Sequence, residues 1–203
     1  MARLLHLDSS GRTRGSVSRR LSQYFVDTWR AAHPGDTVTR RDLAADVPPM
    51  IDDGWARAAF LPPDRRTDAD RAALRVSDAL VDEFLACDVH VVGIPMYNFN
   101  APAPFKIYMD QIVRLGRTFT ITEYGAAGLV SGKRVFVCGA SISDYGEGSP
   151  VAHRNHLWPW LRTVYGYMGV TDLSFFWVQS LPGEPGEQAY AAAQAALRTA
   201  VGA

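Results

Sequence analysis

Four short apolar runs and one more polar segment, "TVTRRD", are separated by polar stretches or by stretches with helical spacing. The runs are rich in β-branched, leucine or aromatic residues and have the length of strands. One of them, "VHVVGI", is almost entirely apolar, as expected of a parallel strand that is covered on both faces. The pattern predicts strands at Arg3–Asp8, Thr37–Asp42, Val89–Ile94, Val135–Ala140 and Asp172–Val178.

Most intervals between these runs carry apolar residues at helical spacing. Ser16 is placed to cap a first helix, and Thr67 or Asp68 to cap a helix before the third strand. Further helices are expected from about Pro104 to Leu115, along the apolar stripe from Leu157 to Met168, and from Pro185 to Val201. This alternation predicts one α/β domain over residues 1–203, with a doubly wound parallel sheet and helices on both faces.

The five-strand version of this fold is the flavodoxin-like one, with strand order 2-1-3-4-5. Such sheets bind ligands beyond the carboxyl ends of the first and third strands, where the strand order reverses. Here those strands end next to Ser9 and Pro95, so the loops that follow them are the candidate site. The stretch 44–66, which contains two Pro-Pro pairs, is expected to be a long irregular excursion.

Charge and composition narrow the possible partners. The chain has 21 basic and 21 acidic residues, so its zero net charge offers no field that attracts nucleic acid or an anionic membrane. It contains neither a secretory leader nor an apolar run long enough to cross a bilayer, which indicates a cytoplasmic protein. Cys87 and Cys138 are expected to be buried, reduced thiols.

The loop after the first strand, "SSGRTRGSVS", is rich in hydroxyl groups. It lacks the glycine pattern of a dinucleotide site and the Gly-Lys-Ser/Thr of a P-loop. Its serines surround the amides at the start of a helix, which favour a phosphate group. The loop can therefore bind a monophosphate, although an ordinary helix cap followed by a polar turn also explains it.

The loop after the third strand, "PMYNFN", combines two aromatic residues with a methionine. A flavin ring needs flat apolar surface for its faces and polar groups for one edge. Met96, Tyr97 and Phe99 can supply the surface, and Asn98 can supply the polar group. The alternative is that these side chains close the core or form a dimer contact.

These residues resemble the FMN-dependent NADH-azoreductases, also described as NADH:quinone oxidoreductases. The resemblance spans nearly the whole chain and rests on motifs in several regions. They are "SS" and "SVS" in the first loop, "RDLAA" at 41–45, "PMYNFN" at 95–100, "GRTFTIT" at 116–122, "GLVSGK" at 128–133, "GYMGVTD" at 166–172, and Lys106, Tyr108 and Asp110. "PMYNFN" with these spacings is far more specific than the serine cluster alone.

The resemblance implies a flavodoxin-like homodimer with one FMN per subunit. It implies that NADH, or NADPH, reduces FMN, and that a quinone or azo compound then takes the electrons in the same pocket. Matched position by position, Ser10, Ser16, Val17 and Ser18 would hold the phosphate. Met96, Tyr97, Asn98 and Phe99 would hold the ring, and no catalytic side chain is assigned.

The chain departs from this family after the fourth strand. Where the family usually has Ser-Arg-Gly-Gly, this chain has "ASIS", residues 140–143. Ser141 or Ser143 can still bond the polar edge of the ring, and Tyr145 can line the substrate side together with Phe119 and Tyr124. A specialised biosynthetic reductase, a flavodoxin-like electron carrier and a dimer without turnover are therefore alternatives.

Other residue pairs have simpler explanations. His153 and His156 are expected to be surface or interface residues because no third metal ligand is evident near them. Lys106 and Asp110 are expected to form a helix pair, and Gly132–Lys133 a turn. Trp158 and Trp160 are either core residues or part of an aromatic acceptor pocket.

Overall fold

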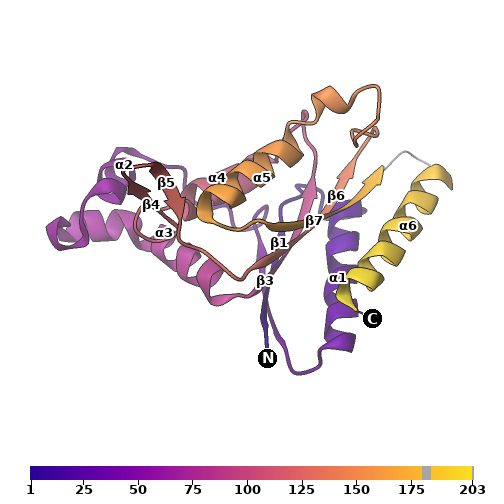
Figure 1. Cartoon of the computed structure of the whole chain (residues 1–203), viewed down its shortest axis with the longest axis horizontal. Coiled ribbons are helices and arrows are strands. Elements are labelled where there is room, and N and C mark those ends of the chain that lie inside the picture. The colour runs from indigo at the N-terminus through magenta and orange to yellow at the C-terminus, as the bar shows by residue number, and fades with distance from the viewer. Residues whose placement is uncertain (180–183, 203) are drawn as a thin grey trace.

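The computed structural model describes residues 1–179 and 184–202, and a five-stranded parallel sheet lies at its centre (Figure 1). Its strands are β1 (Arg3–Asp8), β2 (Thr37–Asp42), β3 (Val89–Pro95), β6 (Arg134–Ser141) and β7 (Asp172–Gln179). They pair in the order β2-β1-β3-β6-β7. Because β6 and β7 are the fourth and fifth strands of this sheet, the predicted order is confirmed.

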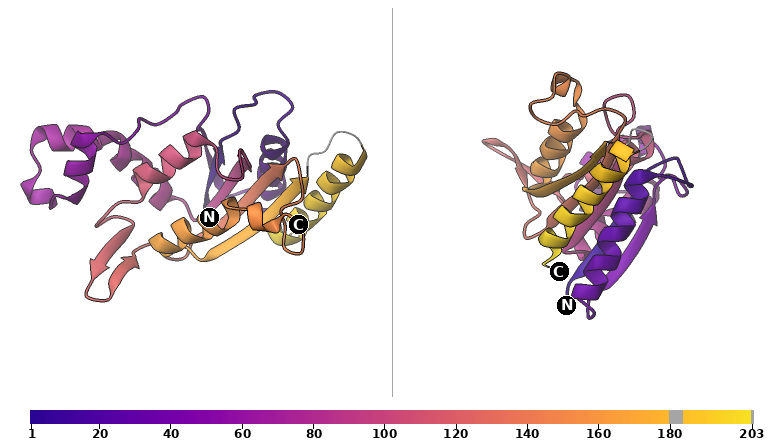
Figure 2. Two further views of the ribbon diagram at one scale, coloured as in Figure 1. Left: turned by 90° about the horizontal axis from the view of Figure 1, so that it is seen from above. Right: turned by 90° about the vertical axis from the view of Figure 1, so that its right-hand side faces the viewer.

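Helices cover both faces of the sheet. Their bounds are α1 (Val17–Ala32), α3 (Asp68–Ala86), α4 (Ala103–Ile112), α5 (Leu157–Met168) and α6 (Glu184–Val201). α1 and α6 lie side by side over one face, and α3, α4 and α5 cover the other (Figure 2). The predicted doubly wound arrangement is confirmed.

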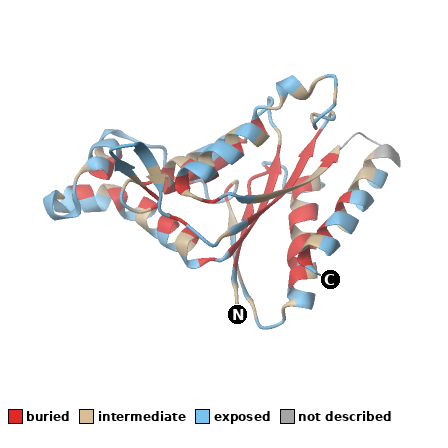
Figure 3. Ribbon diagram, viewed as in Figure 1, coloured by how far each residue is buried: buried red, intermediate tan, exposed pale blue. Residues whose placement is uncertain are grey.

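Alternation along β1 shows how the sequence divides the core between the two faces. Leu4 packs with residues of α1 and α6, whereas Leu5 and Leu7 pack with residues of α3, α4 and α5. Side chains on a strand point alternately to opposite faces, so one strand serves both cores. The buried positions follow the strands and the sheet-facing sides of the helices (Figure 3).

The prediction that 44–66 is irregular was wrong. The stretch contains α2 (Asp53–Phe60) and a 3-10 turn at Pro63–Arg65. Asp52 caps α2 because its carboxylate accepts from the amide of Trp55 at 2.8 Å. The indole of Trp55 then donates to Gln111 of α4 at 2.9 Å, which fixes α2 to the body. The proline pairs flank this short helix and do not interrupt it.

A two-stranded antiparallel hairpin, β4 (Phe119–Thr122) and β5 (Gly125–Gly128), lies outside the main sheet and was not predicted. At Gly128 a Cβ atom would lie 2.2 Å from the backbone nitrogen of Gly169, so the end of the hairpin packs directly against the end of α5.

Two further expectations from the sequence concern the cysteines and the presence of membrane-spanning helices. Cys87 and Cys138 are free and buried, as expected. Within residues 1–179 and 184–202, no helix combines the length and the apolar character that crossing a bilayer demands.

Candidate functional site

A cavity of about 180 Å³ lies where the carboxyl ends of β1 and β3 meet the start of α1. Its lining comes from three loops that are far apart in the sequence. The lining residues are Ser10, Arg12, Ser16, Val17, Ser18, Pro95, Met96, Tyr97, Ala140, Ser141 and Ile142. The topology therefore brings the hydroxyl-rich loop, the aromatic loop and the "ASIS" segment together at one place.

The serine cluster, defined as Ser10, Ser16 and Ser18, forms the polar wall of this cavity. The three residues are 1%, 6% and 1% exposed, respectively, although residues 11–15 between Ser10 and Ser16 are exposed. Ser16 caps α1, because its hydroxyl accepts from the amide of Arg19 at 3.4 Å, and it lies 3.3 Å from the hydroxyl of Ser18.

The electrostatics at the serine cluster favour an anion. The first amides of a helix have no acceptor inside the helix, and the helix dipole is positive at this end. Val17 and Ser18 are the first two residues of α1, and Arg12 also lines the cavity. Among the described residues that line it, none is acidic. Hydroxyls, amides and one guanidinium thus converge, which is a donor set suited to a phosphate monoester.

The aromatic loop folds into a tight turn, Tyr97–Asn100. Tyr97 and Asn100 exchange two backbone hydrogen bonds, of 2.9 and 3.1 Å. Asn98 and Phe99 between them have φ angles of 48° and 71°. Two successive left-handed residues make a turn of type I′, which a phenylalanine adopts only at a cost in backbone energy. Such strain is typical of loops that hold a ligand.

The structure divides the four predicted ring residues among three environments. Met96 and Tyr97 line the cavity, and the Tyr97 hydroxyl lies 3.4 Å from the hydroxyl of Ser10. Asn98 lines an adjoining cavity of about 520 Å³. Phe99 meets the ring of Tyr145 edge-on, with 6.0 Å between centroids. Tyr97 and Phe99 are each 40% exposed, so both retain apolar surface that a flat ligand can cover.

The adjoining cavity shows whether Trp160 is a core residue or lines a pocket. It is lined by Tyr97 and Asn98, by the start of α4, and by Lys106 and Trp160. Trp160 is half-buried and also meets Phe105 edge-on, so it takes part in both the core and a cavity wall. The expected pair of Lys106 and Asp110 is present, with 2.5 Å between nitrogen and oxygen.

The "ASIS" segment presents one polar and one apolar side chain. Ser141 is buried; its hydroxyl donates to the carbonyl of Ser143 at 2.6 Å and accepts from the indole of Trp177 at 2.7 Å. Ile142 lines the cavity and is 73% exposed. Ser143 is half-buried and is not among the lining residues. The apolar Ile142 side chain therefore lines the cavity, at a position where the Ser-Arg-Gly-Gly implied by the family resemblance would place glycine.

The residues predicted for the substrate pocket do not all meet at this place. Tyr145 lies beside Phe99, as described above. Phe119 is buried against Tyr167, with 4.8 Å between ring centroids, and lines a separate apolar pocket. Tyr124 lies at the hairpin between β4 and β5 and is 91% exposed. Within one chain, Phe119 and Tyr124 are thus not part of the cavity at the serine cluster.

Sequence analysis did not identify Asp8, the last residue of β1, which is 1% exposed and lines a neighbouring groove together with Ser16. Its carboxylate accepts from Ser22 at 2.9 Å and from Arg40 at 3.1 Å, and lies 3.4 Å from His6. Burial is the largest influence on the pKa of Asp8 and raises it, but His6, Ser22 and Arg40 together outweigh burial and hold the pKa below its usual value. The sequence signal that could have identified Asp8 is a charged residue at the end of an apolar strand.

The predicted surface character of the two histidines agrees with the structure. His153 and His156 are exposed, and His156 donates its backbone N–H to the carbonyl of Phe99 at 3.1 Å. In the described part of the chain, no three His, Cys, Asp or Glu side chains are grouped so that they could hold a metal ion.

Comparison with known proteins gives consistent results along the whole chain. Residues 2–201 match the family described as having a flavodoxin-like fold. The chain is 46% identical over 202 residues to the FMN-dependent NADH:quinone oxidoreductase of Nostoc punctiforme, a match that covers 99% of this chain and 98% of the relative. The chain belongs to the family of FMN-dependent NADH:quinone oxidoreductases.

Further members and a solved structure agree. FMN-dependent NADH:quinone oxidoreductase 2 of Trichormus variabilis is 48% identical over 182 residues, which cover 89% of this chain and 88% of the relative. The crystal structure of azoreductase from Bacillus anthracis str. Sterne has a TM-score of 0.89 and 26% identity, and the match covers 99% of each chain. The oxidoreductase family and its azoreductase neighbours thus share this architecture.

The cavity of this oxidoreductase family member fits the cofactor in the family's name. FMN combines a phosphate monoester with a large planar ring. The serine cluster and the α1 amides offer donors for the phosphate, and Met96 and Tyr97 offer apolar surface at the other side of the same cavity. The lining residues therefore offer, in one cavity, both the polar donors and the apolar surface that FMN requires.

Proposed function

We propose that this protein, working as one domain over residues 1–203, is an FMN-dependent NADH:quinone oxidoreductase that also reduces azo compounds or related conjugated acceptors. The observation that supports this most directly is that the serine cluster and Met96 and Tyr97 line one cavity. The names of relatives such as the Nostoc punctiforme protein support the quinone acceptor, and the azoreductase neighbour supports the azo acceptor. The donor is NADH, as in those names, or NADPH.

The protein's tasks are to bind, orient and shield. FMN, when bound, supplies the redox chemistry by accepting a hydride and returning electrons to the acceptor. Ser10, Ser16, Ser18 and the amide of Val17 bind the phosphate. Met96 and Tyr97 cover ring surface, with the exposed face of Phe99 beside them, while Asn98 and Ser141 provide polar groups for its edge; Ser143, which does not line the cavity, is left out of this assignment. No side chain is required as a nucleophile, so none is assigned as catalytic.

An absorbance spectrum and an anaerobic titration test the proposal together. The purified protein is expected to be yellow and to release FMN on denaturation. Addition of NADH without oxygen should bleach the flavin absorbance, and a small quinone should restore it. A colourless protein that takes up no added FMN would contradict the proposal.

A homodimer belongs to the proposal, because the chain leaves apolar residues uncovered. On and beside the β4–β5 hairpin, Ile121 is 64% exposed, Tyr124 91% and Leu129 50%. In a homodimer such residues can cover each other or reach the partner's cavity, which gives Tyr124 its predicted place in an acceptor pocket; Phe119 stays buried in its own chain. Sedimentation equilibrium should give twice the chain mass, and Tyr124→Ser should weaken self-association. The cytoplasmic location stays a prediction.

One observation favours an altered acceptor range within this function. Ile142, which is 73% exposed, narrows the cavity beside Tyr97. Ile142→Gly should therefore raise kcat/KM for a bulky azo dye relative to a small quinone by about 3-fold to 10-fold, in line with one pocket side chain. An unchanged ratio would show that Ile142 does not shape the acceptor site.

A further inference from the structure

Arg19 makes contacts that connect the loop of the serine cluster to the edge of the sheet. Its guanidinium forms a two-pronged pair with Asp42 at the end of β2, with nitrogen–oxygen distances of 2.6 and 2.7 Å. The same group donates to the backbone carbonyl of Ser10 from Nε at 3.1 Å and from Nη2 at 2.6 Å. Its Nη1 atom, which bonds Asp42, also lies 3.5 Å from the carboxylate of Asp8. The side chain is only 12% exposed, so it is held in one place.

The position of the Ser10 carbonyl determines which way the next peptide group faces. In a trans peptide the C=O of one residue and the N–H of the following residue point in opposite directions. The described chain has no cis peptide bonds. Because Arg19 holds the Ser10 carbonyl on its own side, the N–H of Gly11 points away from Arg19. The carbonyl, which would repel an anion, is thereby kept occupied.

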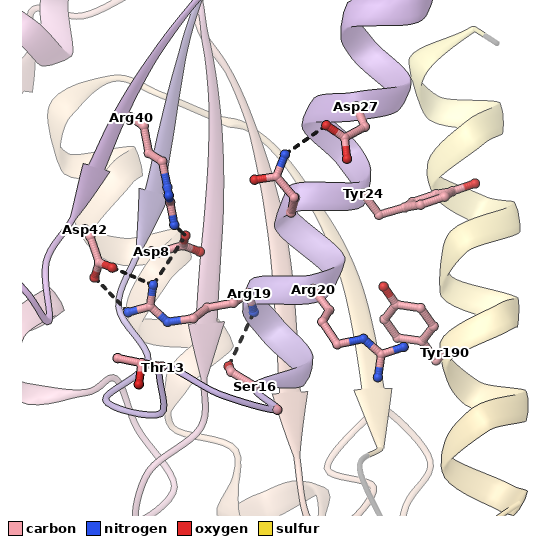
Figure 4. Close-up of a pocket in the computed structure, with 12 residues that line it drawn as sticks. Asp8, Thr13, Ser16, Arg19, Arg20, Tyr24, Asp27, Arg40, Asp42 and Tyr190 are labelled. Carbon is pink, nitrogen blue, oxygen red and sulfur yellow. Dashed lines mark hydrogen bonds and ion pairs between the residues drawn. The ribbon is translucent and has the colours of Figure 1, made fainter.

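Arg19 acts from behind the loop. It lines a shallow groove with Asp8, Arg40 and Asp42 and is not among the residues that line the cavity of the serine cluster (Figure 4). Two arginines and two aspartates make up this group, so it adds no net charge near the cavity. Its influence on a bound phosphate therefore comes from geometry, and long-range attraction contributes little.

The neighbouring Arg20 is a natural control. It lies on the other side of α1, with its guanidinium 4.5 Å from the ring centroid of Tyr190 (Figure 4). Both arginines are in the first turns of the same helix and carry the same charge. They differ in that Arg19 bonds to the carbonyl of Ser10.

We propose that Arg19 is a positioning residue for the phosphate group of FMN: clamped by Asp42, it orients the Ser10–Gly11 peptide so that donors, and not a carbonyl, face the phosphate. This inference rests on the proposed FMN site. It assigns to Arg19 a part of phosphate recognition that involves no contact with the phosphate itself. The planar fork of arginine can bond an aspartate and a carbonyl at once, whereas the ammonium of lysine cannot reproduce that geometry.

The test titrates the full chain, freed of flavin, with FMN and with riboflavin, which has the same ring but no phosphate. Arg19→Lys keeps the charge and should weaken FMN binding at least 10-fold while changing riboflavin binding less than 2-fold. Arg20→Lys should leave both affinities within 2-fold of the unsubstituted protein. Flavin fluorescence reports binding without reliance on turnover.

Asp42→Asn provides a second variant that leaves Arg19 in place and loosens its clamp. It should weaken FMN binding about 3-fold to 10-fold, again with little effect on riboflavin, as expected for a weakened charge-assisted bond. Equal loss of both flavins in the two variants, or unchanged FMN binding in Arg19→Lys, would overturn the inference. If the unsubstituted protein binds neither flavin, the proposed function fails instead.

Discussion

Polar groups lie beside both ends of β3, but they face different partners. At the amino end, Lys133 donates to the carbonyls of Leu85 and Cys87 at the end of α3, and His90 lies 3.3 Å from the Cys87 carbonyl. At the carboxyl end, buried hydroxyls of the serine cluster line a cavity. The polar groups at the amino end thus bond to the chain itself. Those at the carboxyl end face a cavity that can hold a ligand, as in parallel sheets generally.

Gly93, near the carboxyl end of β3, shows how closely that end is built. A Cβ atom there would lie 2.5 Å from the Asp8 carboxylate and 2.6 Å from the Ser22 hydroxyl. A side chain at this position would push β3 away from Asp8 and Ser22. The two ends should therefore respond differently to substitution: the carboxyl end mainly in flavin binding, the amino end mainly in stability.

The largest effect is expected from Ser18→Asp. An aspartate in the first turn of a helix is favourable for the helix, so α1 should remain folded. The same carboxylate would face the phosphate and repel it, and FMN binding should fall by about 100-fold or more. Titration with FMN and riboflavin measures the difference. A similar loss for both flavins would show that the phosphate does not lie at Ser18.

A smaller effect is expected from Asn98→Val in the Tyr97–Asn100 turn. Asn98 has a φ of 48°, and a β-branched residue there costs about 2 kcal/mol. The turn should open, with FMN binding about 10-fold weaker. Asn98→Gly is the matched control, because glycine accepts this conformation and should keep the affinity within about 3-fold. Equal losses in both variants would instead point to the asparagine side chain.

The strands, their order and most helices could be predicted because they depend on local apolar patterns. The proximity of the serine cluster to Met96 and Tyr97 of "PMYNFN" could be predicted, because a parallel sheet places the ends of its first and third strands together. The proposed role of Arg19 could not be predicted. That role depends on the bond to Asp42, which is distant in sequence and close in space. The β4–β5 hairpin was missed for a related reason: "GAAG" has no strand propensity, and packing at Gly128 decides its conformation.

At the amino end, Lys133→Met should lower stability by about 1.5 kcal/mol, because two carbonyls at the end of α3 lose a charged donor. Flavin affinity should be unchanged. Lys106→Met removes an exposed pair with Asp110 and should cost only about 0.3 kcal/mol. Urea denaturation measures both. A change in FMN binding by Lys133→Met relative to the unsubstituted protein would show that the two ends of β3 are coupled.

His90 gives a smaller expected effect than Lys133, and it depends on pH. Burial is the largest cause and the charge of Lys133 the second, and the pKa of His90 is lowered to about 4. In the unfolded chain a histidine binds its proton near pH 6.5, so between pH 6.5 and about 4 the unfolded state holds more protons and stability falls as pH falls. Between pH 7 and pH 5.5 this loss is about 1 kcal/mol.

His90→Gln should remove that part of the pH dependence of stability, and His153→Gln, at an exposed position, should leave it intact. Since His90 lies at the end of β3 away from the serine cluster, FMN affinity should follow the same pH profile in both variants; a difference between them would contradict the separation of the two ends.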